Sequence, residues 1–218
     1  MLILAFDTAT SSATAALVRD GVLLGERAVP ARVLMAAIDG LLDEAGVVPV
    51  DIDGVACGVG PGSFTGVRIG LALARGLSLA LDVPVAGVST LAALAAGAAP
   101  GTGGAEAAGG APGATGVIAV VDARRSEVFV LAGGRESCTR PEELVFAPGT
   151  LLVGDGAVRY RELLERAGGA IPADHSELHL PRARFHALLA RSFGPADAAL
   201  PVYLRAPDAK PAMPVGAA

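Results

Sequence analysis

The sequence has few of the side chains that disulfide, zinc and lysine chemistry require. Its two cysteines, Cys57 and Cys138, are too few for a disulfide framework or a structural zinc site. Lys210 is the single lysine among 17 basic residues, so we expect no catalytic lysine. Low cysteine use is typical of a reducing compartment, and the expected location is therefore the cytoplasm.

Two further absences bear on partners. The longest basic block is the pair Arg124-Arg125 and the net charge is −5, so we do not expect the chain alone to bind nucleic acid tightly. Uncharged apolar runs stay below the roughly 18 residues that a membrane helix needs, because Arg68 and Arg75 interrupt the best stretch, Val67 to Leu81. The N-terminal MLILAFDTAT lacks a basic segment and predicts a strand rather than a secretion signal. We therefore expect no contact with a membrane.

Patterns that mark a catalytic or metal centre are also missing. His175 and His179 are four residues apart, but Pro172 and Pro181 flank them, which argues against a metal pair on a helix. The third histidine, His186, follows alone, and the sequence has neither a Gly-x-Ser-x-Gly elbow nor an evident Cys–His arrangement. The expectation is a chain without catalytic residues or a metal site of its own.

The first 97 residues predict one α/β layered domain, in which strands and helices alternate. Asp20-Gly21 between apolar runs is a strong hairpin signal, Gly46 is a helix stop, and Ser89 is a helix N-cap. The expected elements are strands at 1–7, 13–29 (two strands), 53–60 and 84–88, and helices at 33–46, near 62–81 and at 89–97.

A second, smaller domain is expected at residues 116–206. The stretch from 98 to 115 consists of Gly, Ala, Pro and Thr with one charge, which predicts a flexible linker. Strands at 116–134, a strand and a helix at 151–168, and a last helix at 182–194 follow, and this last helix could pack back on the first domain. The Pro-rich end, 207–218, predicts a disordered tail.

Both domains begin with the same unit: a strand, an aspartate, a tight turn and a second strand. This repeat is typical of the two-domain actin/Hsp70-like fold (ASKHA, ribonuclease H-like), an α/β class with a mixed sheet in each domain and a nucleotide cleft between them. The turns hold phosphate and metal in such proteins. The residues that would form a vestigial nucleotide turn here are Asp7, Thr8, Thr10, Ser11, Asp122 and Arg124.

The second turn argues against a working kinase. Ala123, Arg124 and Arg125 follow Asp122, where a glycine would let phosphate approach the backbone. The two arginines could clamp phosphate or could be solvated surface residues, and the sequence leaves both possibilities open. Weak or interfacial binding of ATP or ADP remains possible, without a tightly bound cofactor.

The stretch GVGPGSFTGVRIGLALARGLSLAL, residues 58–81, resembles a phosphate loop but lacks its lysine, and Pro61 removes one backbone donor. Small residues recur every fourth position in it, and on a helix they would form one packing stripe. Each interior glycine costs a helix about 1 kcal/mol, so close packing should account for them. The stripe comprises Gly62, Gly66, Gly70, Ala74 and Ser78.

The other side of this helix pairs arginines with apolar side chains, as protein interfaces do. Together with the apolar helix at 33–46, it could supply half of a four-helix interface. The alternative is ordinary surface. The expected partner contacts are Leu34, Met35, Ile38, Phe64, Arg68, Leu71, Ala72, Arg75 and Leu79.

Five segments together resemble the bacterial TsaB family, the dimerization subunits of tRNA threonylcarbamoyladenosine biosynthesis. They are ILAFDTAT, GVGPGSFTGVRIGLALARGLSLAL, VPVAGVSTLAALA, VVDARRSEVF and PVYLR, and the resemblance covers residues 2–205. The resemblance implies the actin/Hsp70-like fold, a docking role on the catalytic paralogue TsaD with the ATPase TsaE, and contact with tRNA only through that complex. A homodimer is implied for the chain alone.

Two departures from the family pattern stand out. The segment before the first helix, AVPARVLMAAID, is several residues short and lacks a histidine, which puts part of the partner surface in doubt. The Gly/Ala-rich linker is longer than usual. The alternatives to a docking subunit are an independent ATPase or small-molecule kinase of the same fold, and, less favoured for want of a nucleophile, a peptidase.

Overall fold

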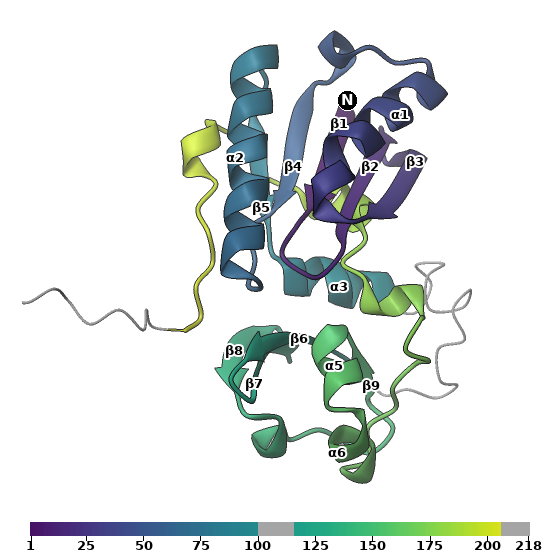
Figure 1. Cartoon of the computed structure of the whole chain (residues 1–218), viewed down its shortest axis with the longest axis vertical. Coiled ribbons are helices and arrows are strands. Elements are labelled where there is room, and N and C mark those ends of the chain that lie inside the picture. The colour runs from purple at the N-terminus through teal and green to yellow at the C-terminus, as the bar shows by residue number, and fades with distance from the viewer. Residues whose placement is uncertain (100–115, 206–218) are drawn as a thin grey trace, which may run out of the picture.

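The computed structural model describes residues 1–99 and 116–205, which form two lobes, one above the other in Figure 1. The expected disordered tail at 207–218 lies outside the described residues, as does the expected linker except for Ala98 and Ala99. Each lobe has a mixed sheet with helices on both faces. The two-domain α/β expectation is therefore confirmed.

Sheet order is the same in both lobes, which confirms the repeat. The first sheet has the order β3-β2-β1-β4-β5 and the second β8-β7-β6-β9, so the first four strands of one correspond to the four strands of the other. The strands are β1 (Leu2–Asp7), β2 (Ala13–Arg19), β3 (Val22–Val29), β4 (Gly54–Gly58), β5 (Val85–Val88), β6 (Val117–Arg124), β7 (Glu127–Ala132), β8 (Arg135–Thr139) and β9 (Leu151–Val153).

Local signals account for most boundaries. Asp20 and Gly21 have φ of 50° and 81°, as a two-residue hairpin turn requires, and they join β2 to β3. Gly46, with φ of 61°, ends α1 (Leu34–Ala45). The Ser63 hydroxyl accepts a hydrogen bond from the Gly66 N–H at the start of α2 (Phe64–Leu81), and Ser89 caps α3 (Thr90–Ala98) in the same way.

Three elements differ from expectation. Strand β8, RESCT, was not predicted because it is a polar edge strand without apolar alternation. The helix expected within 151–168 is divided at Tyr160 into α5 (Asp155–Arg159) and α6 (Arg161–Arg166). Helix α7 (Ala183–Leu189) ends five residues early, because Gly194 instead exchanges two backbone hydrogen bonds with Val85 at the edge of the first sheet. The 3₁₀ turns are η1 (Ala31–Val33), η2 (Pro49–Asp51), η3 (Pro141–Glu143), η4 (Glu177–His179) and η5 (Ala196–Ala198).

The first sheet buries alternate side chains of β1 against different helices, as strand periodicity dictates. Leu4 and Phe6 pack in one cluster with residues of α1 and α2. Ala5, on the opposite face, packs with Ala183 and Ala187 of α7. A helix from the end of the chain therefore completes the core of the first lobe.

Helix α3 does the converse: it comes from the first half of the chain and packs in the second lobe. Leu91 and Leu94 are fully buried with Ala119 and Val121 of β6, so α3 covers the second sheet although it comes from the first half of the chain. Helices α5 and α6 cover the other face of that sheet. The division expected at residue 97 is therefore wrong for the packing of the core. Helix α3 continues to Ala98 and packs in the core of the second lobe, because its buried apolar residues contact β6 there.

The small-residue stripe of α2 packs against the chain itself. A Cβ at Gly66 would lie 2.1 Å from the carbonyl oxygen of Thr8, and one at Gly70 would lie 2.5 Å from the Thr8 hydroxyl. Gly62 precedes the N-cap and is not on the helix, but it is equally close to the Ala9 carbonyl oxygen, at 2.4 Å. The turn after β1 is therefore what approaches the stripe.

Length and composition alone make α2 apolar enough to cross a membrane, in contrast to the expectation from its two arginines. This single helix is weak support for a membrane span, since helices that pack in protein cores pass the same test. Val67, Leu71 and Ala74 of α2 are buried against the first sheet.

Gly76 provides a first prediction, because no atom outside its own helix neighbourhood lies within 4 Å of where its Cβ would be. Gly76→Ala should raise the free energy of unfolding by about 0.5–1 kcal/mol through helix propensity. Gly66→Ala should lower it by about 1–3 kcal/mol, because its Cβ would meet the Thr8 backbone. Urea denaturation measures both, and equal effects of the two substitutions would contradict the packing described.

Buried His179 provides a second prediction. Its Nδ1 accepts a hydrogen bond from the Gly154 N–H (3.0 Å) and its Nε2 lies 3.2 Å from the Pro172 carbonyl oxygen, which together fit a neutral ring. Burial holds the pKa of His179 below its ordinary value. As pH falls, His179 therefore becomes protonated at a higher pH in the unfolded chain than in the folded one.

The unfolding free energy should consequently decrease with falling pH below about 6.5, by at most about 1.4 kcal/mol per pH unit from this group. His179→Asn should flatten that part of the curve, whereas the same change at exposed His175 should not. Denaturant titrations at several pH values measure the difference. Identical pH profiles for His179→Asn and the native chain would refute the assignment.

Candidate functional site: the cleft between the lobes and the outer face of α2

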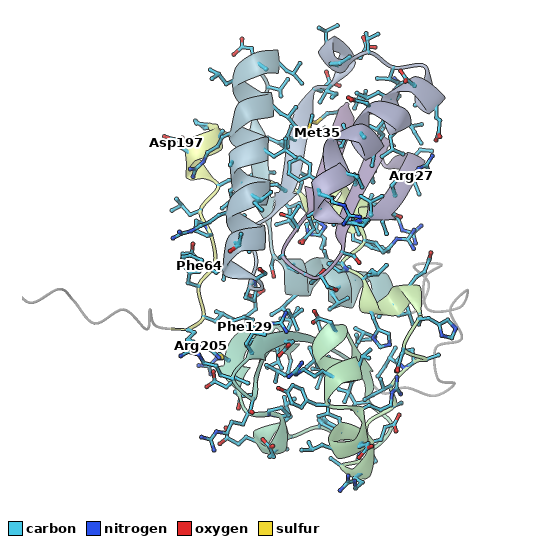
Figure 2. All side chains as sticks on the ribbon, in the orientation of Figure 1. Arg27, Met35, Phe64, Phe129, Asp197 and Arg205 are labelled. Carbon is cyan, nitrogen blue, oxygen red and sulfur yellow. The ribbon has the colours of Figure 1, made fainter. Side chains whose placement is uncertain are left out.

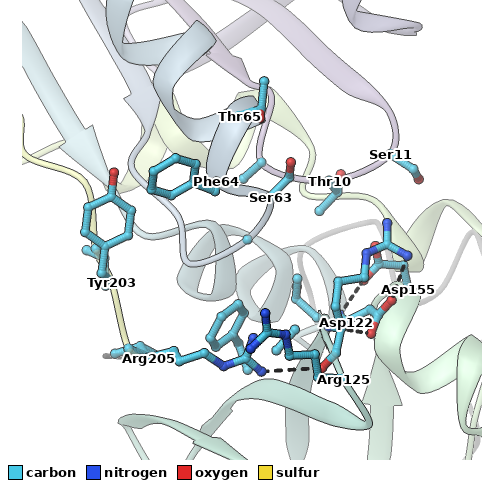
Figure 3. A pocket seen from close by; sticks show the side chains of 18 of the residues that line it. Thr10, Ser11, Ser63, Phe64, Thr65, Asp122, Arg125, Asp155, Tyr203 and Arg205 are labelled. Carbon is cyan, nitrogen blue, oxygen red and sulfur yellow. Dashed lines mark hydrogen bonds and ion pairs between the residues drawn. The ribbon is translucent and has the colours of Figure 1, made fainter. Parts of the chain in front are cut away.

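A cleft with a volume of about 800 Å³ lies between the lobes, and residues from distant parts of the sequence line it (Figure 3). The first lobe contributes the turn after β1 and the start of α2. The second lobe contributes the β6–β7 turn and Asp155, and the C-terminal segment supplies residues 202–205. Phe64 and Phe129 are both lining residues, one from each lobe (Figure 2).

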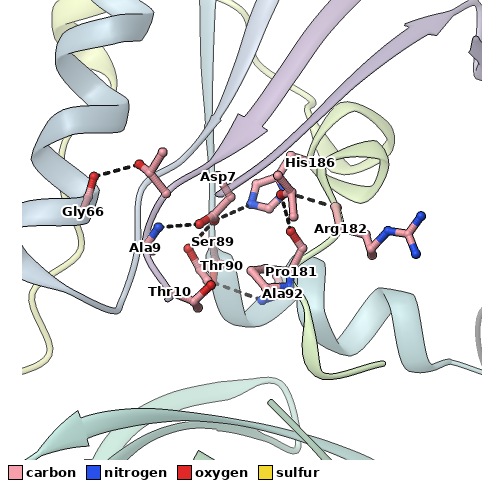
Figure 4. A network of polar contacts seen from close by, with 12 residues as sticks. Asp7, Ala9, Thr10, Gly66, Ser89, Thr90, Ala92, Pro181, Arg182 and His186 are labelled. Atoms are coloured by element: carbon pink, nitrogen blue, oxygen red, sulfur yellow. Dashed lines mark hydrogen bonds and ion pairs between the residues drawn. The ribbon is translucent and has the colours of Figure 1, made fainter. Parts of the chain in front are cut away.

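Asp7, expected to face a nucleotide, is instead the centre of a fully buried polar network (Figure 4). Its Oδ2 accepts hydrogen bonds from the Thr90 hydroxyl (2.6 Å) and lies 2.8 Å from Nε2 of His186, and its Oδ1 accepts from the Ala9 N–H (2.6 Å). A buried carboxylate needs such partners, and they hold it away from the cleft. Placing Asp7 in a vestigial nucleotide turn is therefore wrong.

Thr8 is also absent from the lining of the cleft. It is buried, and its hydroxyl donates to the Gly66 carbonyl oxygen at 2.7 Å. Thr10 and Ser11 do line the cleft, and across it lie Asp122 and Arg124. The structure thus brings together four of the six residues expected in the two turns.

The second turn has an unusual backbone. Arg124, Arg125 and Ser126 have φ of 61°, 54° and 59°, a region that favours glycine. The Asp122 carboxylate stabilises this turn, since its Oδ1 accepts from the Arg124 N–H (2.9 Å) and its Oδ2 lies 3.2 Å from the Arg124 guanidinium. The long arginine side chains therefore stand in the cleft where a kinase would have glycine.

An aromatic pair forms one end of the cleft. The ring centroids of Phe64 and Tyr203 are 5.7 Å apart, and the Arg68 guanidinium lies 3.6 Å from the Phe64 ring centroid. Arg68 Nε also donates to the Tyr203 hydroxyl at 3.2 Å. No pattern in the sequence placed Tyr203 or Arg205 in the cleft, because the segment that carries them has no local periodicity.

This C-terminal segment also contacts the arginines expected at a partner interface. Arg75 donates to the Ala199 carbonyl oxygen (3.4 Å), and the Val202 N–H donates to the Val59 carbonyl oxygen (2.8 Å). In Figure 1 the segment runs alongside α2. Arg68 and Arg75 are therefore engaged by their own chain, although both remain exposed.

Three of the expected partner contacts are wrong because the core of the chain buries them. Leu34, Ile38 and Leu71 are at most 4% exposed. Met35, Phe64 and Leu79 are exposed, with Leu79 at 87%, and Ala72 is exposed as well. Helical spacing in the sequence could not tell which apolar arc of each helix faces the sheet.

Exposed apolar and small residues form a continuous strip along α2, which we call the outer face of α2. The strip includes Ile69, which is 48% exposed and which the sequence reasoning missed. These positions share one side of the helix by their spacing. The outer face of α2 consists of Ile69, Ala72, Gly76, Leu79 and Ala80.

The titratable groups near the site do not make a nucleophile. Burial raises the pKa of the Cys57 thiol to about 12, and it also raises the pKa of half-buried Cys138. Burial likewise raises the pKa of Asp155, whose Oδ1 accepts from the Asp122 N–H at 2.9 Å. Among the described residues, no three His, Cys, Asp or Glu side chains are grouped as a metal site would need. Two of the arginines that line the cleft form ion pairs within the chain, Arg124 with Asp122 and Arg205 with Glu127.

Two lobes with corresponding strand orders and opposed turns across a cleft define a two-domain protein of the actin/Hsp70-like class. Residues 31–152 match the family model of TsaD, tRNA N6-adenosine threonylcarbamoyltransferase. The chain belongs to the TsaB family.

Individual relatives agree with this membership. YeaZ from Pseudomonas aeruginosa is 33% identical, with a TM-score of 0.75 over 93% of this chain and 99% of that one. The tRNA threonylcarbamoyladenosine biosynthesis protein TsaB of Escherichia coli K12 is 42% identical over 134 residues, 59% of this chain. That match spans only about half of the E. coli protein, 53%. An uncharacterised Mycobacterium bovis protein is 35% identical over 96% of this chain and 94% of its own length.

The Asp7 network provides a prediction for the site. Asp7→Asn keeps the shape of the side chain but removes its charge. It also replaces one carboxylate oxygen, so the buried Thr90 hydroxyl and His186 ring have fewer acceptors, and the free energy of unfolding should fall by about 1–3 kcal/mol. Asp43→Asn, at an exposed position, should change it by less than about 0.5 kcal/mol. Chemical denaturation measures both, and a neutral Asp7→Asn would mean that the network does not stabilise the fold.

Proposed function

We propose that this chain is a non-catalytic subunit of the complex that transfers threonylcarbamoyl to N6 of the adenosine next to the tRNA anticodon. It docks on the catalytic paralogue TsaD and supports it. The observation that carries the proposal is the outer face of α2, an exposed apolar strip on a helix whose other side is fully used in the core.

Relatives support the biological process. The E. coli and Bacillus subtilis relatives are named for tRNA threonylcarbamoyladenosine biosynthesis, and the matching family model is that of the transferase. A chain related in sequence to the transferase has a fold that can present equivalent helices to it. In symmetric homodimers the same surface patch is used on both subunits, and subunits that share a fold can pair in a similar way.

The chemistry of the outer face supports docking of another helix. Gly76 lies in the middle of the strip with no atom near its Cβ position, so the chain's own packing does not account for a glycine that costs about 1 kcal/mol of helix propensity. Small residues flanked by Ile69 and Leu79 let a second helix approach closely and bury both large side chains. The neighbouring Met35 of α1, 47% exposed, could extend the surface.

The alternatives receive less support. An independent ATPase or kinase would need Asp7 in the cleft, but it is buried against His186 and Thr90. One P. aeruginosa protein of known structure is described as similar to a peptidase, but the Thr90–Asp7–His186 grouping here is fully buried and out of reach of a peptide. We propose no catalytic role for it.

Further partners follow from the same proposal. The ATPase TsaE would join the complex through TsaD, tRNA would be contacted through the complex, and the chain alone could form a homodimer through the outer face of α2. All of these steps take place in the cytoplasm, which is the location we propose.

The test is complex formation with TsaD from the same source, measured by size exclusion with light scattering. Ile69→Glu with Leu79→Glu places two charges on the outer face and should weaken complex formation by at least about 100-fold, since both side chains would be desolvated. The fold should persist, because both positions are exposed in the isolated chain.

Val145→Glu is the matched control, as Val145 is 91% exposed but lies in the second lobe. It should leave complex formation unchanged. Native affinity in the double variant, or equal loss in the control, would show that docking uses another surface. Absence of any complex with the unchanged chain would overturn the proposed function itself.

A further inference from the structure

The segment that follows α7, residues 195–205, contacts both lobes, and we call it the C-terminal strap. It begins next to Gly194, which exchanges two backbone hydrogen bonds with Val85 at the edge of the first sheet. After the 3₁₀ turn η5 it runs alongside α2 to the level of the second lobe (Figure 1). The strap therefore passes from one lobe to the other on the side of the molecule that α2 occupies.

Backbone hydrogen bonds and apolar packing hold the first part of the strap to the first lobe. Ala199 is 6% exposed within the core of this lobe, and its carbonyl oxygen accepts a hydrogen bond from Arg75 (3.4 Å). The Val202 N–H donates to the Val59 carbonyl oxygen (2.8 Å), and the Val202 side chain packs against the same core. Up to this point the strap is part of the first lobe.

Tyr203 is the last residue of the strap with contacts to the first lobe. Its ring centroid lies 5.7 Å from that of Phe64, and its hydroxyl accepts a hydrogen bond from Arg68 Nε (3.2 Å). Both partners lie in the first turns of α2, where this helix meets the cleft. Tyr203 thus holds the strap at the edge of the cleft, directly before the chain enters the second lobe.

The next two residues are anchored in the second lobe. Leu204 is partly buried and packs against the apolar cluster that contains Val121 of β6. Arg205 forms an ion pair with Glu127 of β7, and its guanidinium also donates to the Arg124 carbonyl oxygen (3.4 Å). An ion pair near the surface contributes little by itself, so the leucine is the stronger of the two anchors.

The strap is well separated from the helices that also connect the lobes. Helices α3 and α7 cross where Phe185 lies against Gly97, and the Ser89 hydroxyl at the start of α3 donates to Glu136 of β8. In Figure 1 α3 lies between the lobes, whereas the strap follows the edge of the molecule. Two lobes joined near their centres can tilt about that joint, and a link at the edge opposes the tilt with the longest lever.

We propose that the C-terminal strap is a conformational device that sets the angle between the lobes and hence the width of the cleft. Detaching Leu204 and Arg205 from the second lobe frees the lobes to tilt apart, while the rest of the strap stays on the first lobe. Residues 202–205 also line the cleft, so detachment changes its lining as well as its width. The proposal concerns the isolated chain and does not depend on docking to TsaD.

Spin-label distances between the lobes, measured by double electron–electron resonance, test the proposal. Val50→Cys in the first lobe and Ser137→Cys on β8 provide two exposed labelling sites. Cys138→Ser removes the half-buried native thiol, and Cys57 is fully buried. The labelled chain is diluted with unlabelled chain, so that only distances within one molecule are recorded, and a narrow distance distribution is expected.

Leu204→Ala with Arg205→Gln removes both anchors in the second lobe. It should widen the distance distribution at least about twofold, because the lobes then sample a range of angles. Leu163→Ala with Arg166→Gln is the matched control, since it also removes one partly buried leucine and one ion-paired arginine, but both lie on α6 within the second lobe. The control should leave the distribution unchanged.

Leu204→Ala alone keeps the ion pair and should widen the distribution less than the double variant does. It carries the test if thermal unfolding shows that the double variant does not fold. A native width in the folded Leu204 variants, or equal widening in the control, would overturn the proposal. Widening in the strap variants alone would establish it, and failure here leaves the proposed function standing, since complex formation with TsaD is measured separately.

Discussion

The buried carboxylate of Asp7 is the contact on which the arrangement of the two lobes depends. It ends β1, and its partners Thr90 and His186 begin α3 and lie within α7, 83 and 179 residues away. Three segments remote in sequence are therefore fixed at one charged group in a site that excludes water, where each hydrogen bond matters more than at a surface. The Asp7 carboxylate also lies so close to β4 that a Cβ at Gly58 would be 2.0 Å from its Oδ2. The same contact that joins the lobes removes from the cleft the acid that metal-dependent phosphate chemistry would use.

The exchange of helices makes the two lobes interdependent. Helix α3 completes the second core and α7 the first, and Phe185 of α7 lies against Gly97 of α3 where the two cross. A second anchor holds the start of α7: the Glu26 side chain on β3 is only 4% exposed and lies 2.5 Å from the guanidinium of Arg182. Each member has a further partner, since Glu26 also accepts from the Arg184 N–H (3.0 Å) and Arg182 also pairs with Glu177, so the buried charges are compensated within a small network. Neither sheet has both faces covered by residues from its own half of the chain.

Local chemistry made much of this fold predictable. The Asp20-Gly21 hairpin, the Ser89 cap and the Gly46 stop each act within four residues, and the sequence predicted all three. The Ser63 cap is equally local, but it was not predicted. What the sequence could not locate depends on contacts across the chain. Apolar spacing alone does not say that Leu71 faces the sheet and Ile69 the solvent, since both lie in one long apolar run. The same holds for the cleft. The repeated strand–Asp unit predicted its two turns, but only tertiary packing buries Asp7 away from the cleft and places residues 202–205 in its lining.

Helix α2 combines two kinds of glycine, those that the packing of the chain requires and one that it does not. Gly66 and Gly70 are dictated by Thr8, which leaves no space for a side chain, so their helix-propensity cost is offset within the chain. Gly76 has open space on its outer side and no such compensation inside the chain. The first turn of the same helix reaches the cleft, where Phe64 and Arg68 meet Tyr203 of the C-terminal segment. The cleft and the outer face of α2 therefore lie on one helix, whose buried side packs against the first sheet.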